Sequence, residues 1–295
     1  MSTSSTATPG PNQGVPAEWA GLIDDAAIFP PGNSPLSGAV TAFHARRREQ
    51  WYAPLVSSFV VSAAAVAEID SPTELPISLV VAGGPDALHN ALATAATVNV
   101  RVVAVEVALR DTEDLPGAVR RAAAARDIAQ AGGFLGTGTP VYVELPQTDA
   151  TGGWLDAVDI AGERGLLLKF RTGGVTADLF PSPQRLASWI AAAVNRNVAF
   201  KCTAGLHNAV RHRADDGFVH HGFLNVMAAT DAAAGGADIA EITALLTEEN
   251  SAALAQRIGS IDVPAVRRRF VSHGSCSVTE PLEDLLTLEL LEGPQ

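Results

Sequence analysis

Short runs of β-branched and other apolar residues alternate with alanine-rich helical stretches along most of this chain. We predict strands at Leu55–Val61, Ile77–Ala82, Val100–Leu109, Val141–Leu145, Leu166–Phe170, Val198–Cys202 and Arg269–Ser272. We predict helices at Asp86–Thr97, Leu115–Ala131, Trp154–Glu163, Ser182–Val194 and Pro281–Leu290. Apolar strands that alternate with helices are typical of a parallel α/β sheet, because each helix returns the chain to the start of the next strand.

The length of the alternating region favours a (β/α)8 barrel of the TIM type, which needs about 250 residues. Two segments are candidates for the eighth strand, Leu22–Phe29 and Ile239–Leu245, although the second segment looks more helical. A doubly wound sheet is the alternative fold. Against it, no predicted strand is followed by a Gly-x-Gly-x-x-Gly loop, and the glycine-rich segment 132–138 follows a helix instead.

Composition limits the partners and the compartment. Residues 1–17 are rich in Ser, Thr, Pro and Gly and are predicted to form a disordered tail before a single barrel domain at 18–295. The net charge of −12 argues against nucleic acid and anionic membrane surfaces. The chain has two cysteines, and it shows no apolar leader before Arg46 and no apolar run of bilayer length. These features favour a location in the reducing cytoplasm.

The chain contains only two lysines beside its many arginines. Lys169 and Lys201 each end a predicted apolar strand, and each is followed by Thr and Gly. Arginine keeps its proton in proteins, whereas a buried lysine can lose it. The two lysines are therefore predicted to act as amines.

Side-chain alternation places both lysines on the inner face of the predicted barrel. Leu168 and Phe170 flank Lys169 on the helix-facing side, and Phe200 and Cys202 flank Lys201 in the same way. Two ammonium groups in an apolar pocket repel each other and lose hydration, so we expect lowered pKa values and a nucleophilic lysine. A structural pair of lysines bound to carboxylates inside the barrel is the alternative.

Two carboxylates belong to the same predicted constellation. Glu106 lies in Val102–Val107 and Glu144 in Val141–Leu145, where an acidic side chain is costly to bury unless it is paired or functional. Either residue can neutralise a lysine or relay protons, and the sequence leaves the two roles open.

The last predicted strand leads into small residues before a helix. Such a turn can bind an anion through backbone amides, and phosphate in barrels often binds after the final strands. An ordinary turn capped by Ser277 or Thr279 is the alternative, and Cys276 is a candidate nucleophile. The candidate substrate-binding residues are Arg171, Thr172, Thr203, His207, Gly274, Ser275, Cys276 and Ser277.

Four histidines follow the Lys201 strand, at His207, His212, His220 and His221. Their spacing matches no zinc motif, so a substrate-covering loop or a helix surface is favoured over a metal site. Asp24 and Asp25 are predicted to form a turn or a helix cap, although they can also reach the barrel mouth.

The order of these motifs resembles the class I, Schiff-base aldolases, and most of all the deoxyribose-phosphate aldolase family. That family is a (β/α)8 barrel with two acids on successive strands, two Lys-containing strand ends and a final glycine-serine turn. The corresponding order here is Glu106, Glu144, Lys169–Gly173, Lys201–Gly205 and Gly274–Ser277. The resemblance implies that Lys169 forms the Schiff base, that Lys201 lowers its pKa and that Glu106 relays protons.

This chain also departs from the family. Glu106 replaces an Asp, Arg171 replaces a small residue, and about 70 residues separate Lys201 from the final turn, which is more than in the family. Deoxyribose phosphate is therefore not the expected substrate.

The leading hypothesis is a lyase that acts on a small anionic carbonyl compound held by Arg171, without a cofactor. The alternatives are a metal-dependent hydrolase or lyase that uses His207, His220 or His221 with Glu144, and a non-catalytic metabolite-binding barrel. A homo-oligomer remains open.

Overall fold

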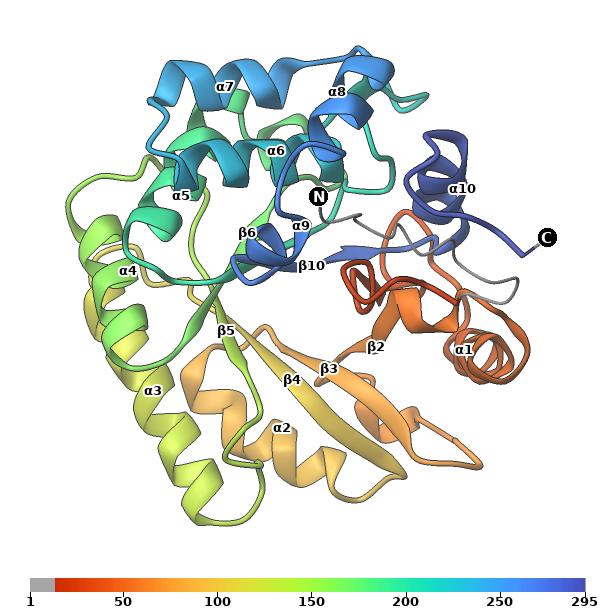
Figure 1. Ribbon diagram of the computed structural model, residues 1–295. Coiled ribbons are helices and arrows are strands. Elements are labelled where there is room, and N and C mark those ends of the chain that lie inside the picture. The colour runs from red at the N-terminus through yellow and green to blue at the C-terminus, as the bar shows by residue number, and fades with distance from the viewer. Residues whose placement is uncertain (1–13, 295) are drawn as a thin grey trace, which may run out of the picture.

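Eight parallel strands close into a barrel that is surrounded by helices (Figure 1). The structure is a computed structural model that describes residues 14–294. Most of the predicted N-terminal tail therefore lies outside the described residues. Where the description begins, Val15 packs against the core and the Pro16 carbonyl accepts a hydrogen bond from the Trp19 amide. The predicted TIM-type barrel is confirmed.

The barrel strands follow one another around the ring in chain order. They are β1 (Ile23–Asp25), β2 (Val56–Ser62), β3 (Leu75–Val81), β4 (Val100–Ala108), β5 (Val141–Glu144), β6 (Leu167–Arg171), β7 (Phe200–Thr203) and β10 (Phe270–Ser275). All seven predicted strands are present. The eighth is β1, inside the Leu22–Phe29 candidate, and it closes the ring by pairing with β10 and β2. The other candidate, Ile239–Leu245, is helical.

The helices of residues 14–294 are α1 (Leu36–Glu49), α2 (Leu88–Ala95), α3 (Leu115–Ala131), α4 (Gly153–Glu163), α5 (Pro183–Asn195), α6 (Phe223–Ala234), α7 (Ile239–Thr247), α8 (Ser251–Ile258), α9 (Val263–Arg267) and α10 (Thr279–Thr287). Short 3-10 helices are η1 (Ala53–Leu55), η2 (Val66–Glu68), η3 (Pro85–Ala87) and η4 (Ala177–Leu179). Two-residue strands β8 (His212–Arg213) and β9 (Val219–His220) form a small antiparallel hairpin in the long connection after β7. Within residues 14–294, every helix is too short or too polar to cross a bilayer.

Side-chain caps fix where several helices begin. Asp114 accepts a hydrogen bond from the Gly117 amide at the start of α3, and Ser182 caps α5 through the Arg185 amide. Asp238 and Glu241 form a reciprocal capping box at α7. This capping box stabilises the start of α7, and it explains why Ile239–Leu245, one of the two candidates for the eighth strand, is a helix.

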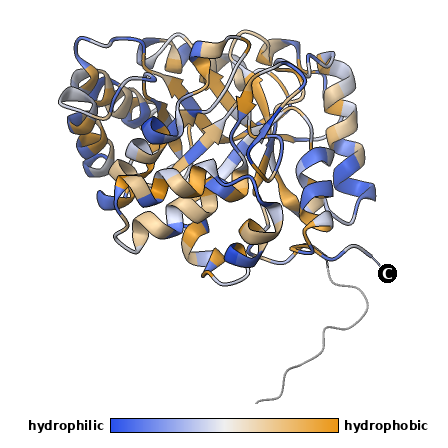
Figure 2. Ribbon diagram, turned by 90° about the horizontal axis from the view of Figure 1, so that it is seen from above, coloured by the Kyte–Doolittle hydropathy of each residue, from blue (hydrophilic) through white to orange (hydrophobic). Residues whose placement is uncertain are grey.

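A stack of aromatic rings fixes which faces of β6, β7 and β10 point outward. Phe170 packs against Trp154 of α4 and Trp189 of α5, with ring centroids 6.3 and 5.7 Å away, and the two tryptophan rings lie 6.3 Å from each other. Phe200 lies 5.1 Å from Phe170 and 5.5 Å from Phe270. Because side chains alternate along a strand, these outward rings turn the residues next to them into the barrel. Figure 2 shows that hydrophobic residues predominate in the strands, whereas hydrophilic residues are frequent on the surrounding helices.

Candidate active site

Both lysines point into the barrel, as the alternation predicted. Lys169 of β6 and Lys201 of β7 are directly opposite each other in the strand register. Each residue is only 2% exposed. The lysines therefore lie within the packed interior of the barrel and not at an open mouth.

Glu106 of β4 bridges the two lysines. Its Oε2 lies 2.6 Å from the Nζ of Lys169, and its Oε1 lies 2.6 Å from the Nζ of Lys201. Each lysine has a second carboxylate: Glu144 of β5 lies 2.9 Å from Lys169, and Asp24 of β1 lies 2.7 Å from Lys201. The four predicted catalytic residues are thus brought together, with Asp24 as a fifth member.

Arg171, the last residue of β6, extends this cluster toward the C-terminal end of the barrel. Its Nε lies 3.2 Å from Oε1 of Glu144, and its side chain is 30% exposed, far more than any other member. The result is a row of alternating charges, called here the charge chain. Its members in order are Asp24, Lys201, Glu106, Lys169, Glu144 and Arg171.

The charge chain sets the protonation of its members. Burial alone would raise the pKa of Glu106, but Lys169 and Lys201 outweigh burial and lower the pKa to about 2. Burial would lower the pKa of Lys169, yet Glu106 and Glu144 outweigh it and raise that pKa. The pKa of Lys201 is also raised, because Asp24 and Glu106 overcome the effect of burial.

The expected lowering of the lysine pKa values is therefore wrong. Repulsion between the two ammonium groups is outweighed by the carboxylates that lie between and beside them. The expectation that Lys201 lowers the pKa of Lys169 fails for the same reason, because Glu106 shields the two cations from each other. The raised pKa values favour the ammonium form of both lysines.

Sequence reasoning missed Tyr142 and favoured a turn or a helix cap for Asp24 over a place in the barrel. Asp24 is a β1 residue, not a turn or helix cap, and it accepts hydrogen bonds from Ser58 at 2.9 Å and Ser272 at 2.6 Å. The ring centroid of Tyr142 lies 5.3 Å from the Nζ of Lys201, and burial raises the tyrosine pKa to about 12. Tyr142 had a usable signal, since it lies two residues before Glu144 and therefore shares its face.

The threonines after the lysines hold the strand ends together. Thr172 is fully buried, and its hydroxyl donates to the backbone carbonyls of Thr203 at 3.2 Å and Ala204 at 2.5 Å. Gly205 has a φ of +75°, and a side chain there would meet the backbone of Gly173. The Thr-Gly sequences therefore join the C-terminal ends of β6 and β7, and the Thr172 hydroxyl is engaged within the protein.

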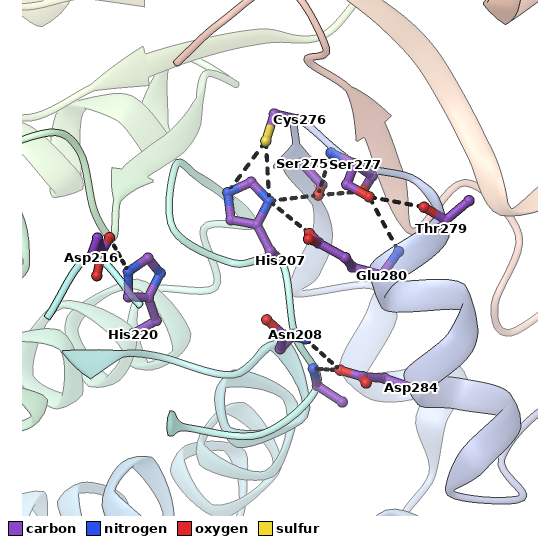
Figure 3. Close-up of polar contacts among 11 residues, drawn as sticks. His207, Asn208, Asp216, His220, Ser275, Cys276, Ser277, Thr279, Glu280 and Asp284 are labelled. Carbon is purple, nitrogen blue, oxygen red and sulfur yellow. Dashed lines mark hydrogen bonds and ion pairs between the residues drawn. The ribbon is translucent and has the colours of Figure 1, made fainter. Parts of the chain in front are cut away.

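The turn after β10 faces His207, and Figure 3 shows the contacts. The Oγ of Ser275 lies 3.2 Å from Nδ1 of His207, and the amide of Ser277 donates to the same Oγ at 3.3 Å. The amide of Glu280 donates to the Oγ of Ser277 at 3.3 Å. The amides of Ser277 and Glu280 therefore already have acceptors within the turn, and the anion nest at Gly274 to Ser277 stays a prediction.

Cys276 and His207 form a neutral pair. The Sγ lies 3.4 Å from Nδ1 of His207, and Oε2 of Glu280 lies 3.5 Å from the same nitrogen. Burial raises the pKa of the Cys276 thiol to about 11 and lowers the pKa of His207 to about 4. The geometry lacks the base–orienter arrangement of a catalytic triad, in which the acid contacts the other ring nitrogen.

The histidines of the connection after β7 do not form one cluster, although His212 and His220 pair across the β8–β9 hairpin with ring centroids 5.6 Å apart. His220 contacts Asp216 at 2.9 Å, and His221 contacts the Pro181 carbonyl at 2.8 Å. Residues 14–294 contain no group of three or more His, Cys, Asp or Glu side chains placed to hold a metal ion. The ligand set of the metal-dependent alternative is therefore not assembled.

Comparison of the chain with protein-family models, with curated proteins and with solved structures gives no match.

Proposed function

We propose that this barrel is a Schiff-base enzyme in which Lys169 condenses with a small carbonyl compound. The observation that carries the proposal is the position of the Lys169 ammonium, 2.6 Å from Glu106 and 2.9 Å from Glu144. The ammonium and the carbonyl give an iminium and one water molecule. The iminium carries the same single positive charge as the ammonium that it replaces, so the carboxylates that stabilise one also stabilise the other.

The raised lysine pKa is compatible with this chemistry because a proton acceptor is already in contact. Before attack, Lys169 transfers one proton to Glu144, which leaves a neutral amine and a neutral acid and does not change the total charge of the chain. The carboxylic acid then returns the proton to the hydroxyl that leaves as water. Glu106 remains paired with Lys201 and keeps one negative charge beside the new iminium.

Arg171 suits the recognition of an anionic substrate. It is the most exposed member of the charge chain and lies at the C-terminal end of the barrel, where barrel enzymes place their active sites. A guanidinium that contacts Glu144 through one nitrogen retains other donors for a carboxylate or phosphate group. The proposed substrate is therefore an anionic carbonyl compound, and the proposed reaction is of the lyase type, similar to class I aldolases.

Borohydride reduction tests the imine directly. We expect that incubation with 2-oxo acids or phosphorylated aldehydes, followed by sodium borohydride, adds the mass of the reduced compound to the peptide that contains Lys169. Peptide mapping is decisive because the chain has only one other lysine. Labelling at Lys201 instead, or no labelling by either class of carbonyl, would contradict the proposal and favour a barrel that only binds metabolites.

A further inference from the structure

A cavity lies at the opposite end of the barrel from Arg171. Its volume is about 310 Å³, and its walls include Ser57, Pro76 and Arg101, each the second residue of its strand, as well as Pro140 just before β5. Because the strands are parallel, these positions all lie at the N-terminal end of the barrel. This space is called here the N-terminal cavity.

The N-terminal cavity has an excess of positive charge. Lys201 and Asp24 reach it from the charge chain, where they are already paired with each other. Arg47 and Arg101 complete the charged lining, and Arg101 shares its charge with Glu74, an exposed residue 3.0 Å away. The charge chain is neutral as a whole, so the two arginines and the single Glu74 leave a net positive lining.

The cavity also contains a buried donor that has no partner. The side chain of Ser78 is fully buried, and its Oγ lacks a hydrogen-bond partner among residues 14–294. Buried hydroxyl groups are almost always hydrogen-bonded, because leaving one unpaired costs free energy. Ser78 lines the cavity, where Ser57 adds another hydroxyl and Tyr142 a phenol. A ligand with acceptor oxygens would satisfy the Ser78 hydroxyl and meet the two arginines.

We propose that the N-terminal cavity binds a small oxyanion, either a free ion or the carboxylate or phosphate group of a small metabolite. Ser78 donates a hydrogen bond to it, and Arg47 and Arg101 supply the charge. The volume is at the low end for small-molecule sites, which suits a small metabolite or a free ion. Lys201 belongs both to the cavity lining and to the charge chain, whereas Ser78, Arg47 and Arg101 lie outside the charge chain, so variants at these three positions test the cavity without replacing a proposed catalytic residue.

Calorimetric titration of the full chain at low ionic strength tests the site, with inorganic phosphate and acetate as separate probes. We expect saturable binding of at least one probe. Ser78→Ala and Arg47→Gln are each expected to weaken it about tenfold or more, since each removes a contact to a charged ligand. The matched control is Arg48→Gln, which changes a neighbouring arginine that is 65% exposed and pairs with Glu49. The affinity of Arg48→Gln for phosphate and for acetate should equal that of the wild type.

The two probes separate the sources of the oxyanion. If only phosphate binds, the natural ligand carries a phosphate group, and if only acetate binds, it carries a carboxylate. If both bind, the cavity recognises the oxyanion that the two groups share. Ser78→Ala is expected to fold, since it removes only a hydroxyl that has no partner. Absence of saturable binding by both probes, or equal affinities in wild type, Ser78→Ala and Arg47→Gln, would overturn the proposal.

Discussion

Glu106→Gln is expected to lower the free energy of unfolding by about 3–5 kcal/mol, because it removes one partner from buried ion pairs. Its carboxylate bridges Lys169 and Lys201, and the neutral amide would leave both ammonium groups short of negative charge in the barrel interior. Urea unfolding followed by circular dichroism measures the loss. The matched control is Glu49→Gln, which breaks an exposed pair with Arg48 and should change stability by no more than about 1 kcal/mol.

The same substitution should change the response to acid. The pKa of Glu106 falls from 4.5 to about 2 in the folded protein, so its contribution to stability is present above pH 4.5 and is lost as the pH falls toward 2. The wild type should therefore lose stability over this interval, and Glu106→Gln should lack that component. A variant as stable as the wild type, with the same acid profile, would show that the bridge contributes nothing.

Lys169→Arg is expected to abolish turnover, because a guanidinium keeps positive charge but cannot deprotonate to attack a carbonyl. Lys201→Arg is the matched comparison, since it makes the same change directly across the strand register. It should slow turnover without abolishing it, because the proposed role of Lys201 is to hold positive charge beside Glu106. Rates with a substrate identified by borohydride trapping provide the measurement.

Both lysines are buried, so the larger guanidinium is also expected to strain the barrel interior in both variants. Circular dichroism separates loss of chemistry from loss of fold, and borohydride labelling of Lys169 should persist in folded Lys201→Arg. Comparable turnover by the wild type and Lys169→Arg would remove the imine mechanism. Loss of soluble protein in both variants would favour a purely structural role for the pair.

The sequence predicted the barrel well because its strands and helices carry different periodicities. Seven strands were long enough to be recognised in the sequence. β1 has only three residues, so the sequence did not decide which segment forms the eighth strand. The inward direction of the lysines was predictable for a similar reason. Phe170 and Phe200, one residue after Lys169 and one before Lys201, had to face the helices, and their rings pack there.

The protonation of the lysines was not predictable, because it depends on contacts between distant segments. Glu106 and Glu144 were recognised as candidates, but nothing in the sequence says that one carboxylate bridges both lysines. Asp24 was predicted to lie in a turn or a helix cap, although it also falls inside Leu22–Phe29, one of the two candidates for the eighth strand. Only closure of the barrel brings β1 beside β10 and places the Asp24 carboxylate next to the Lys201 ammonium.

The charge state of the two lysines tests the charge chain most directly. With ¹⁵N at the ζ position of lysine, the protein should give only two side-chain amine signals, and Lys201→Arg assigns them. We predict that both remain in the ammonium form as the pH is raised to and beyond the ordinary lysine pKa of about 10.4, since the pKa of each is raised. An amine that loses its proton near neutral pH would contradict the charge chain.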